Sequence, residues 1–444
     1  MGSIALLAKQ QGHVITGSDQ NVYPPMSEQL ERAGITLQAP YSPTSIPKIV
    51  DLVIIGNANL GRGNPAVEAL LNSDVAFCSG AEYLGRYLLD NKWVVAVAGT
   101  HGKTTSASMI AWILEYAGLS PGFLIGGIPA NFQHSARLSD SDFFVIEADE
   151  YDTSYFDRRS KFLHYQPRTI VLNNLEFDHA DIFENLEAIQ QQFHLLIRSV
   201  PGNGQLILPE DDKALNEVIA QGCWTPQVRF SSKQNSKAEI RAGAISADGS
   251  KFKITVVDQY QGTINWNLTG QHNVYNACAA IAAARHVGVP PAMAIQGLNE
   301  FKGVKRRMER LIDLPQLKLY DDFAHHPTAI QTTLEGLRAQ VGGATIVALI
   351  EPGSATMRKG IHGKQLIVAT KAADQVFWMQ PDNVEFQLSK LLPESGHRLF
   401  TDSHALIQAV QQLATETKNE LHLIMMSNTS FDGMAKKLLG TLSQ

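Results

Sequence analysis

The chain has 444 residues, a formal net charge of −6 and a hydrophobic content of 44%. This length predicts about two to four domains, and the composition is typical of an ordered globular protein. The small acidic charge does not indicate a large basic surface, so we expect no nucleic-acid partner. The three cysteines lack a metal-binding spacing, and no apolar run fits a membrane span or a secretory signal. We therefore expect a cytoplasmic protein.

Residues 1–91 have the pattern of an open α/β domain. Two apolar runs, 13–19 and 51–58, end in small polar residues, as buried parallel strands do. Between them lies a helical segment that we expect to stop at Gly34. The chain opens on a helical pattern, without the strand and glycine turn that normally precede such a helix.

Residues 92–310 predict a second domain around a parallel, helix-covered sheet. The expected strands are 93–99, 143–149 and 168–174. The alternating stretch 236–268 predicts antiparallel hairpins, and an alanine-rich helix should run from Val274 to about His286.

Residues 311–444 repeat the rhythm of strand and helix and predict a third domain. The expected strands are 317–323, 345–351, 374–380 and 421–427. The predicted fold class is therefore α/β with three domains. The two terminal domains should be Rossmann-like, and the central one should be a P-loop-type domain with a parallel sheet and a small antiparallel part.

The segment AGTHGKTT (98–105) carries the Gly-Lys-Thr of a phosphate-binding loop, but in a shortened form. The common loop would place a glycine at position 97, which is Val97 here. The backbone N–H groups of the segment 98–105 and the N-terminus of the helix that follows are suited to bind phosphate. Lys103 would add a positive charge, and Thr104 would offer a hydroxyl to Mg²⁺. The alternative is a glycine-rich turn. The candidate ATP-binding residues of the loop are Gly99, Thr100, His101, Gly102, Lys103, Thr104 and Thr105.

Carboxylates and a histidine follow the two other central strands. Glu147, Asp149 and Glu150 end the strand 143–149 and could bind Mg²⁺, although a solvated acidic turn would look the same. His179, beside Asp178 and Asp181, could join a second metal ion or be merely structural. Ligands tend to sit at the carboxyl ends of parallel strands, so the strand ends favour one common site.

Three further segments carry polar groups of interest. Asn273 and Asn276 lie at i, i+3 on a helix and could read an adenine edge, although Asn273 could be only a cap. The basic run 302–310 is normally a solvated face, yet at a domain junction an arginine could reach a γ-phosphate. The stretch 320–330 ends a strand with aspartates, one of which could hold a ribose hydroxyl. Its adjacent histidines should point in different directions, which makes a poor metal site.

Together these features predict an enzyme that uses ATP and Mg²⁺ between domains.

The motifs GTHGKTT, EADE, FDH, HNVYN, RRMER and DDFAHHP occur in this order and resemble those of the Mur ligases. These are three-domain, ATP-dependent enzymes that form amide bonds in peptidoglycan assembly. Their loop has the short form, which accounts for Val97. Within the family, stretches such as GSDQNVYPPMS and GNPAVEALL are most similar to members that recycle murein peptides.

The resemblance implies that ATP phosphorylates the carboxylate of UDP-N-acetylmuramate, and that the amine of L-alanyl-γ-D-glutamyl-meso-diaminopimelate attacks the acyl phosphate. It implies catalytic roles for Lys103, His179 and Arg307. Thr104 and Glu147 would bind one Mg²⁺, and His179 would help hold another. Asn273 and Asn276 would lie at the adenine, Arg307 at the γ-phosphate and Asp322 at the ribose. The implied substrate residues are Asp19, Asn57, Asn64, His325, Gly353 and Asn428.

The chain departs from the family pattern in three places. The strand and glycine turn for the UDP diphosphate are not present, and we expect them to be encoded upstream of Met1. Gly353 stands where the recycling members have an arginine, a candidate anchor for peptide carboxylates. Thr429 and Ser430 stand where those members are glycine-rich. We expect these changes to affect peptide specificity more than ATP use.

Three alternatives stay open. The chain could be the family member that adds L-alanine to UDP-N-acetylmuramate. From another class, it could be a P-loop NTPase or small-molecule kinase, or a non-catalytic UDP-sugar-binding protein. The short loop and the basic junction disfavour the kinase, and the retained Lys103, Glu147, His179 and Arg307 disfavour a non-catalytic protein.

Overall fold

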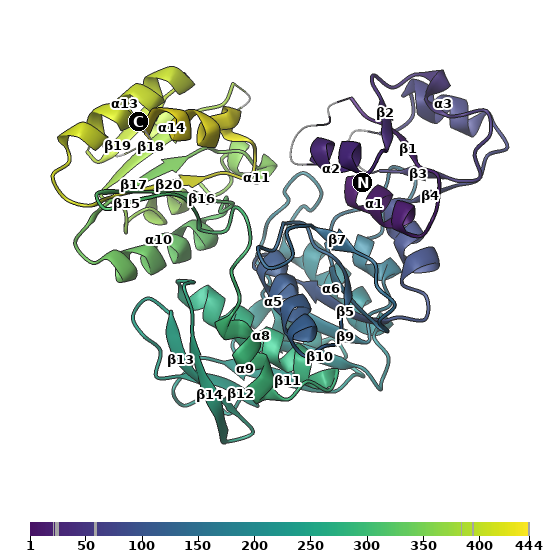
Figure 1. Ribbon diagram of the computed structural model, residues 1–444, viewed down its shortest axis with the longest axis horizontal. Helices are drawn as coiled ribbons and strands as arrows, with labels where there is room; N and C mark the ends of the chain where they lie inside the picture. The colour runs from purple at the N-terminus through teal and green to yellow at the C-terminus, as the bar shows by residue number, and fades with distance from the viewer. Residues whose placement is uncertain (21, 23–25, 57–59, 383, 393–394, 443–444) are drawn as a thin grey trace.

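The computed structural model describes residues 1–20, 22, 26–56, 60–382, 384–392 and 395–442. The chain forms three lobes in order, from the N-terminal elements through the central sheet to the C-terminal sheet (Figure 1). Both large sheets are mainly parallel and lie among helices, which confirms the α/β fold class. The domain limits at 91/92 and 310/311 stay a prediction.

The N-terminal lobe contains two separate two-stranded parallel sheets, β1–β2 and β3–β4. Its elements are α1 (Gly2–Gln10), β1 (Thr16–Ser18), α2 (Met26–Arg32), β2 (Thr36–Gln38), β3 (Val53–Ile55), α3 (Pro65–Leu71), β4 (Phe77–Ser79) and α4 (Gly80–Tyr83). The expectation of buried strands at 13–19 and 51–58 is wrong, since β1 has no buried residue and β3 has only Ile55. A strand with a neighbour on one side only buries less side-chain area than a central strand.

The central sheet has ten strands in the order β14-β13-β12-β11-β10-β9-β5-β8-β6-β7. The strands from β12 to β6 are parallel, whereas β13, β14 and β7 pair antiparallel at the two edges, which confirms the hairpins. The strands are β5 (Trp93–Ala98), β6 (Gly122–Leu124), β7 (Ala136–Arg137), β8 (Phe143–Glu147), β9 (Thr169–Leu172), β10 (Gln205–Pro209), β11 (Gln227–Ser231), β12 (Ile240–Gly243), β13 (Lys251–Val256) and β14 (Gln259–Asn265). Strand β5, which leads into the phosphate loop, lies between β8 and β9.

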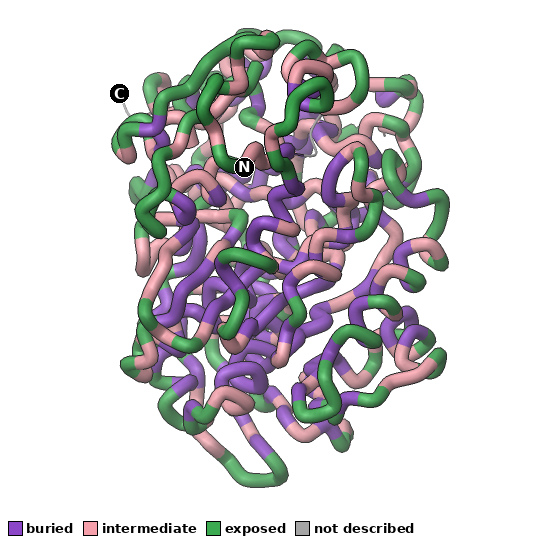
Figure 2. Tube along the Cα trace, turned by 90° about the vertical axis from the view of Figure 1, so that its right-hand side faces the viewer, coloured by how far each residue is buried: buried purple, intermediate pink, exposed green. Residues whose placement is uncertain are grey.

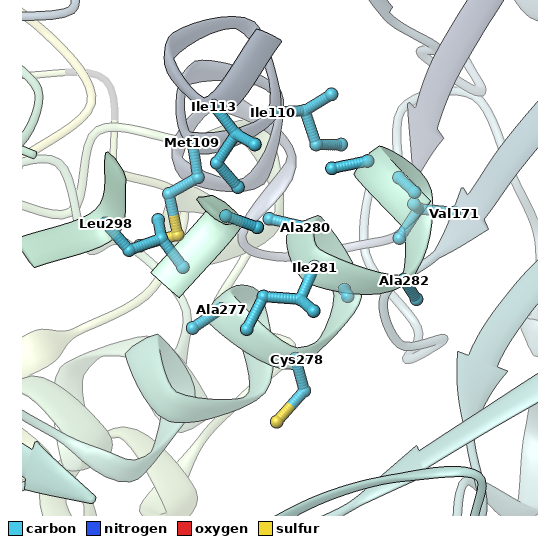
Figure 3. Close-up of a cluster of buried hydrophobic side chains, with 14 of the residues drawn as sticks. Met109, Ile110, Ile113, Val171, Ala277, Cys278, Ala280, Ile281, Ala282 and Leu298 are labelled. Atoms are coloured by element: carbon cyan, nitrogen blue, oxygen red, sulfur yellow. The ribbon is translucent and has the colours of Figure 1, made fainter. Parts of the chain in front are cut away.

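Two helices of the central lobe, α5 (Lys103–Tyr116) and α8 (Gln271–His286), are buried on nearly every side. Figure 2 shows buried segments gathered inside the molecule and exposed ones on its outer loops. In Figure 3, Met109, Ile110 and Ile113 of α5 face the alanine-rich α8, with Leu298 of α9 (Pro291–Asn299) beside them. Small alanine side chains let the helices approach closely, and this packing holds the start of α5 in place. The lobe also has α6 (Leu186–Ser199) and α7 (Lys213–Ala220).

The C-terminal sheet has six strands in the order β15-β16-β20-β17-β18-β19, and only β15 is antiparallel. The strands are β15 (Glu309–Leu314), β16 (Leu317–Asp322), β17 (Thr345–Ile350), β18 (Gln375–Met379), β19 (His397–Phe400) and β20 (Leu421–Met426). The helices are α10 (Pro327–Val341), α11 (Ala355–Arg358), α12 (Lys364–Val368), α13 (Ser403–Glu416) and α14 (Met434–Leu442). The four expected strands are present, and β15 and β19 are additional. In the described part of the chain, every helix is too short or too polar to cross a membrane.

The packing of α8 predicts a large effect of one core substitution. Ile281 is fully buried in this helix, so Ile281→Ala should leave a cavity and lower the free energy of unfolding by about 2–5 kcal/mol. Met293 of α9 is 38% exposed, and Met293→Ala should change it by less than about 1 kcal/mol. Urea denaturation followed by circular dichroism measures both, and equal shifts would contradict the assignment of Ile281 to the core.

Candidate active site

The loop between β5 and α5 turns on two glycines in the backbone region that favours glycine. The φ angle is +137° at Gly99 and +80° at Gly102. A Cβ atom on Gly102 would lie 2.6 Å from Asn276 Oδ1 and 2.7 Å from Asn173 Nδ2. Both the backbone conformation and the available space therefore require glycine at position 102.

Buried amide side chains lie beneath this loop. Asn173 Nδ2 donates to Ser106 Oγ at 2.9 Å and to Asn276 Oδ1 at 3.2 Å. Asn276 Nδ2 in turn donates to Asn273 Oδ1 at 3.3 Å, and Asn273 Nδ2 donates to the carbonyl of Thr269. These bonds brace the loop from below. An adenine contact of Asn273 or Asn276 stays a prediction, because both side chains already have partners within the protein.

The phosphate loop is also tied to the end of β9. The backbone N–H of Thr100 donates to the Asn174 carbonyl at 3.2 Å, and that of His101 donates to Asn174 Oδ1 at 2.8 Å. These two N–H groups are therefore engaged by the protein. The N–H groups of the first turn of α5, from Lys103 to Thr105, have no acceptor within the helix and are the donors available to an anion. Sequence reasoning missed Asn174, although the pair of asparagines directly after a strand was a signal.

Lys103 is held between its own loop and two carboxylates. Its Nζ donates to the Gly99 carbonyl at 2.7 Å and lies 3.1 Å from Glu150 Oε2 and 3.9 Å from Asp149 Oδ1. Burial opposes the charged form, but Glu150 and Asp149 outweigh it, so the pKa of Lys103 is raised. The ammonium stays charged, and its third N–H is available to a phosphate oxygen.

Glu150 connects Lys103 to His179. His179 Nε2 lies 3.0 Å from Glu150 Oε1, and the ring packs edge-on against Tyr151. Burial would raise the pKa of Glu150, but the charges of Lys103 and His179 lower it to about 2. The sequence indicated Glu150 as a candidate magnesium ligand, and the structure instead joins its two oxygens to the two candidate catalytic residues.

Thr104 and Glu147 lie together, as the magnesium prediction requires. Thr104 Oγ1 donates to Glu147 Oε2 at 3.1 Å, and the N–H of Gly126 donates to Oε1 at 2.6 Å. Burial and the nearby Asp149 raise the pKa of Glu147 to about 7. A buried carboxylate beside a hydroxyl offers hard oxygen ligands, and a dication would offset the cost of its charge, so the residues present fit Mg²⁺.

Two neighbouring arginines at the junction of the central and C-terminal lobes have different surroundings. Arg306 donates to the carbonyls of Ser427 and Thr429 and pairs with Asp321. Arg307 stacks on the Phe323 ring at 4.8 Å and takes part in none of the ion pairs found among the described residues. Its charge lowers the pKa of Glu147. Of the two arginines, Arg307 is the one free to meet a γ-phosphate.

Asp322 holds this junction in place. Its Oδ2 accepts from the N–H of Met308 at 2.7 Å, and its Oδ1 accepts from the N–H of Ala324 at 2.9 Å. Burial raises its pKa, although Arg307 opposes the shift. The carboxylate therefore fixes the turn that carries Arg307, and its predicted contact with a ribose is not tested by these bonds.

Comparison with known proteins assigns the chain to a family. Three family models match in order: the Mur ligase family catalytic domain over 1–92, the Mur ligase middle domain over 97–284, and the Mur ligase glutamate ligase domain over 306–427. The UDP-N-acetylmuramate–L-alanyl-gamma-D-glutamyl-meso-2,6-diaminoheptandioate ligase of Escherichia coli K12 is 47% identical over 445 residues, which cover 100% of this chain and 96% of that protein. The chain is a Mur ligase.

Two further relatives define its place among the Mur ligases. The crystal structure of a murein peptide ligase from Psychrobacter arcticus 273-4 matches with a TM-score of 0.76 at 41% identity, over 100% of this chain and 96% of that chain. The UDP-N-acetylmuramate–L-alanine ligase of Caldicellulosiruptor bescii is 33% identical over 79% of this chain and 75% of that protein.

The C-terminal lobe of this Mur ligase places Gly353 and Thr429 side by side. They follow β17 and β20, which pair in parallel, and a Cβ atom on Gly353 would lie 2.5 Å from Asn428 Oδ1 and 2.6 Å from Thr429 Cγ2. The hydroxyls of Thr429 and Ser427 both donate to Glu351 Oε2. A larger residue at position 353 would require Thr429 and Asn428 to move, so the two departures from the family pattern are coupled.

The other predicted substrate residues have structural roles or lie apart. Asn64 caps α3, where its Oδ1 accepts from the N–H of Ala66. Asp19 follows β1 and is exposed, and Asn57 lies outside the described residues. His325 Nδ1 lies 2.8 Å from the Phe323 carbonyl, and burial lowers its pKa to about 4. No contact of these residues tests their substrate roles, which stay predictions.

The raised pKa of Glu147 predicts that magnesium binding depends on pH. Below pH 7 the carboxyl is protonated and must lose its proton to bind a cation, so the affinity of the nucleotide-free protein should fall by up to about tenfold per pH unit. Isothermal titration calorimetry between pH 6 and 8 measures this. Glu147→Gln removes the titrating group and should abolish the dependence. Equal affinity of the unsubstituted protein at pH 6 and pH 8 would contradict the assignment.

Proposed function

We propose that the protein is an ATP-dependent ligase that joins L-alanyl-γ-D-glutamyl-meso-diaminopimelate to UDP-N-acetylmuramate in peptidoglycan recycling. The observation that carries the proposal is the 47% identity, over the whole chain, to a ligase named for this pair of substrates. The similarity to a murein peptide ligase of known structure supports it independently.

The phosphate loop supplies the ATP site of this proposal. The first-turn N–H groups of α5 and the third N–H of Lys103 would bind phosphate oxygens. Arg307 would approach the γ-phosphate from the other lobe. A substrate carboxylate and ATP repel one another, so these fixed positive groups stabilise the negative charge that gathers as the phosphoryl group is transferred. The amine of the peptide then attacks the acyl phosphate, and phosphate leaves.

The remaining residues would position groups around this reaction. Thr104 and Glu147 would hold Mg²⁺, whose charge when bound offsets that of the phosphate oxygens. Glu150 fixes Lys103 and the ring of His179, and His179 would help hold a second ion. We assign residues 1–91 to the UDP-sugar, 92–310 to ATP and 311–444 to the peptide.

A second candidate function is the addition of L-alanine to UDP-N-acetylmuramate. The departures at Gly353 and Thr429 lie in the lobe that we assign to the peptide, which makes this candidate worth testing. The lower identity and coverage of the L-alanine-adding relative, 33% over 79% of the chain, favour the tripeptide.

An assay of ADP release distinguishes the candidates. With UDP-N-acetylmuramate, we expect release that depends on the tripeptide and a UDP-linked product of the mass that one amide bond requires. Release with L-alanine alone would move the assignment to the second candidate. Turnover without the sugar nucleotide would indicate an NTPase or kinase, and no turnover with any combination would contradict an enzymatic function.

Removal of Lys103 should abolish this activity. In Lys103→Ala the positive charge at the phosphates is lost, so we expect kcat to fall at least about 100-fold. Lys103→Arg keeps a charge beside Glu150 but changes its shape, and should also be impaired. Lys92, before β5, donates to the Ser141 carbonyl at 2.6 Å, at the opposite end of the same strand. Lys92→Ala is the matched control and should keep its activity. Thermal unfolding checks that each variant is folded, and a folded, fully active Lys103→Ala would contradict the loop assignment.

A further inference from the structure

A second group of ligating side chains lies between the lobes, beside the phosphate loop. His101 comes from the phosphate loop, Glu176 follows β9, and His326 precedes α10 in the C-terminal lobe. One ligand atom from each, His101 Nε2, Glu176 Oε2 and His326 Nδ1, lies within 4.8 Å of the other two. Residues 75 and 225 positions apart in the chain thus converge on one point.

The three atoms form a nearly equilateral triangle. The distance is 3.2 Å from His101 Nε2 to Glu176 Oε2, 3.1 Å from His101 Nε2 to His326 Nδ1, and 3.4 Å from His326 Nδ1 to Glu176 Oε2. Ligands about 2.0–2.1 Å from a tetrahedral zinc ion lie roughly 3.3 Å from one another. The triangle therefore has the dimensions of three such ligands.

Hydrogen bonding does not account for all three edges. His326 Nδ1 accepts from the N–H of Thr328 at 3.3 Å, so it carries no proton, and a bound cation would replace this long hydrogen bond at its single lone pair. Its edge to Glu176 Oε2 then joins two acceptors. The single N–H that His101 Nε2 can carry does not satisfy both of its neighbours. A cation at the centre would be attractive to all three atoms.

The surroundings favour the protonation states that bind metals. Burial and the neighbouring imidazoles of His101 and His362 lower the pKa of His326 to about 3, which keeps its ring neutral. Burial would raise the pKa of Glu176, but its contacts with His101 and the hydrogen bond from Thr328 help to lower it to about 2. A neutral imidazole and an ionised carboxylate are the ligating forms.

Two further groups adjoin the three ligand atoms. Thr328 Oγ1 donates to Glu176 Oε2 at 2.8 Å and orients the carboxylate, as an outer-shell partner of a metal ligand does. The ring of His362 lies edge-on to His326, with centroids 4.6 Å apart. Its Nε2 is buried and has no hydrogen-bond partner among the described residues, but its ring nitrogens are not among the mutually close ligand atoms. Imidazoles with one carboxylate suit zinc, whereas magnesium prefers oxygen ligands.

We propose that His101, Glu176 and His326 bind Zn²⁺, which clamps the phosphate loop of the central lobe to the start of α10. This site is distinct from the proposed magnesium site at Thr104 and Glu147, and it does not depend on the proposed function. Bound zinc would hold the two lobes in the arrangement seen here.

Titration with Co²⁺, a spectroscopic substitute for Zn²⁺, tests the site without turnover. The full chain without a histidine tag is stripped with a chelator and titrated in excess Mg²⁺, and Zn²⁺ affinity is then measured by displacement of Co²⁺. We expect one equivalent of Co²⁺ with the intense visible absorption of tetrahedral coordination. No binding, or the weak spectrum of octahedral Co²⁺, would overturn the proposal.

Substitutions locate the ion. His326→Asn keeps a cap on α10 but removes the imidazole, and Glu176→Gln removes the charge. Both should weaken Zn²⁺ binding by more than about 100-fold, since loss of an outer-shell partner alone costs about 10–100-fold. Thr328→Val removes only the hydrogen bond from Thr328 to Glu176, so it should weaken Zn²⁺ binding by about 10–100-fold. His404 is exposed on α13, and His404→Ala is the control that should bind like the unsubstituted protein. Unchanged affinity in folded His326→Asn and Glu176→Gln would overturn the proposal.

Discussion

The site depends on the buried ion pair between Lys103 and Glu150, whose side chains are 11% and 3% exposed. Burying either charge alone would be costly, and removal of one partner would leave the other uncompensated. Glu150 also binds His179, so one carboxylate fixes both the start of α5 and the loop after β9. The positions of the phosphate loop, of the acidic end of β8 (147–150) and of the loop after β9 that carries His179 (the histidine loop) therefore follow from one pairing.

This pairing is possible because β5, β8 and β9 are neighbouring parallel strands. Their carboxyl ends meet at one edge of the sheet, and each contributes one of the three segments. Asn173 and Asn174 extend the same edge under the phosphate loop. The packing of α5 against α8 resists movement of the loop from behind, so its orientation is determined on both sides.

The C-terminal lobe meets this edge through specific polar contacts. Thr356 donates to Asp178 at 2.8 Å, and Lys359 donates to the Ala180 carbonyl at 3.1 Å, so α11 lies against the histidine loop. Arg306 and Asp322 fix the turn between the lobes, and Arg307 takes part in none of the ion pairs among the described residues. Two adjacent arginines thus have different tasks, which follow from their partners rather than from their residue type.

The sequence by itself determined the α/β class, the central strands β5, β8 and β9 and four strands of the C-terminal sheet, because periodicity and short motifs are local properties. The three-residue strands of the N-terminal lobe and the strand β19 were too short for their burial or existence to be predicted. Only the tertiary structure decided that Glu150 joins Lys103 to His179, that Asn276 lies beneath Gly102, and that His326 rather than His325 meets His101. These contacts join segments far apart in the chain, and they depend on loop conformation and lobe packing, which no local pattern encodes.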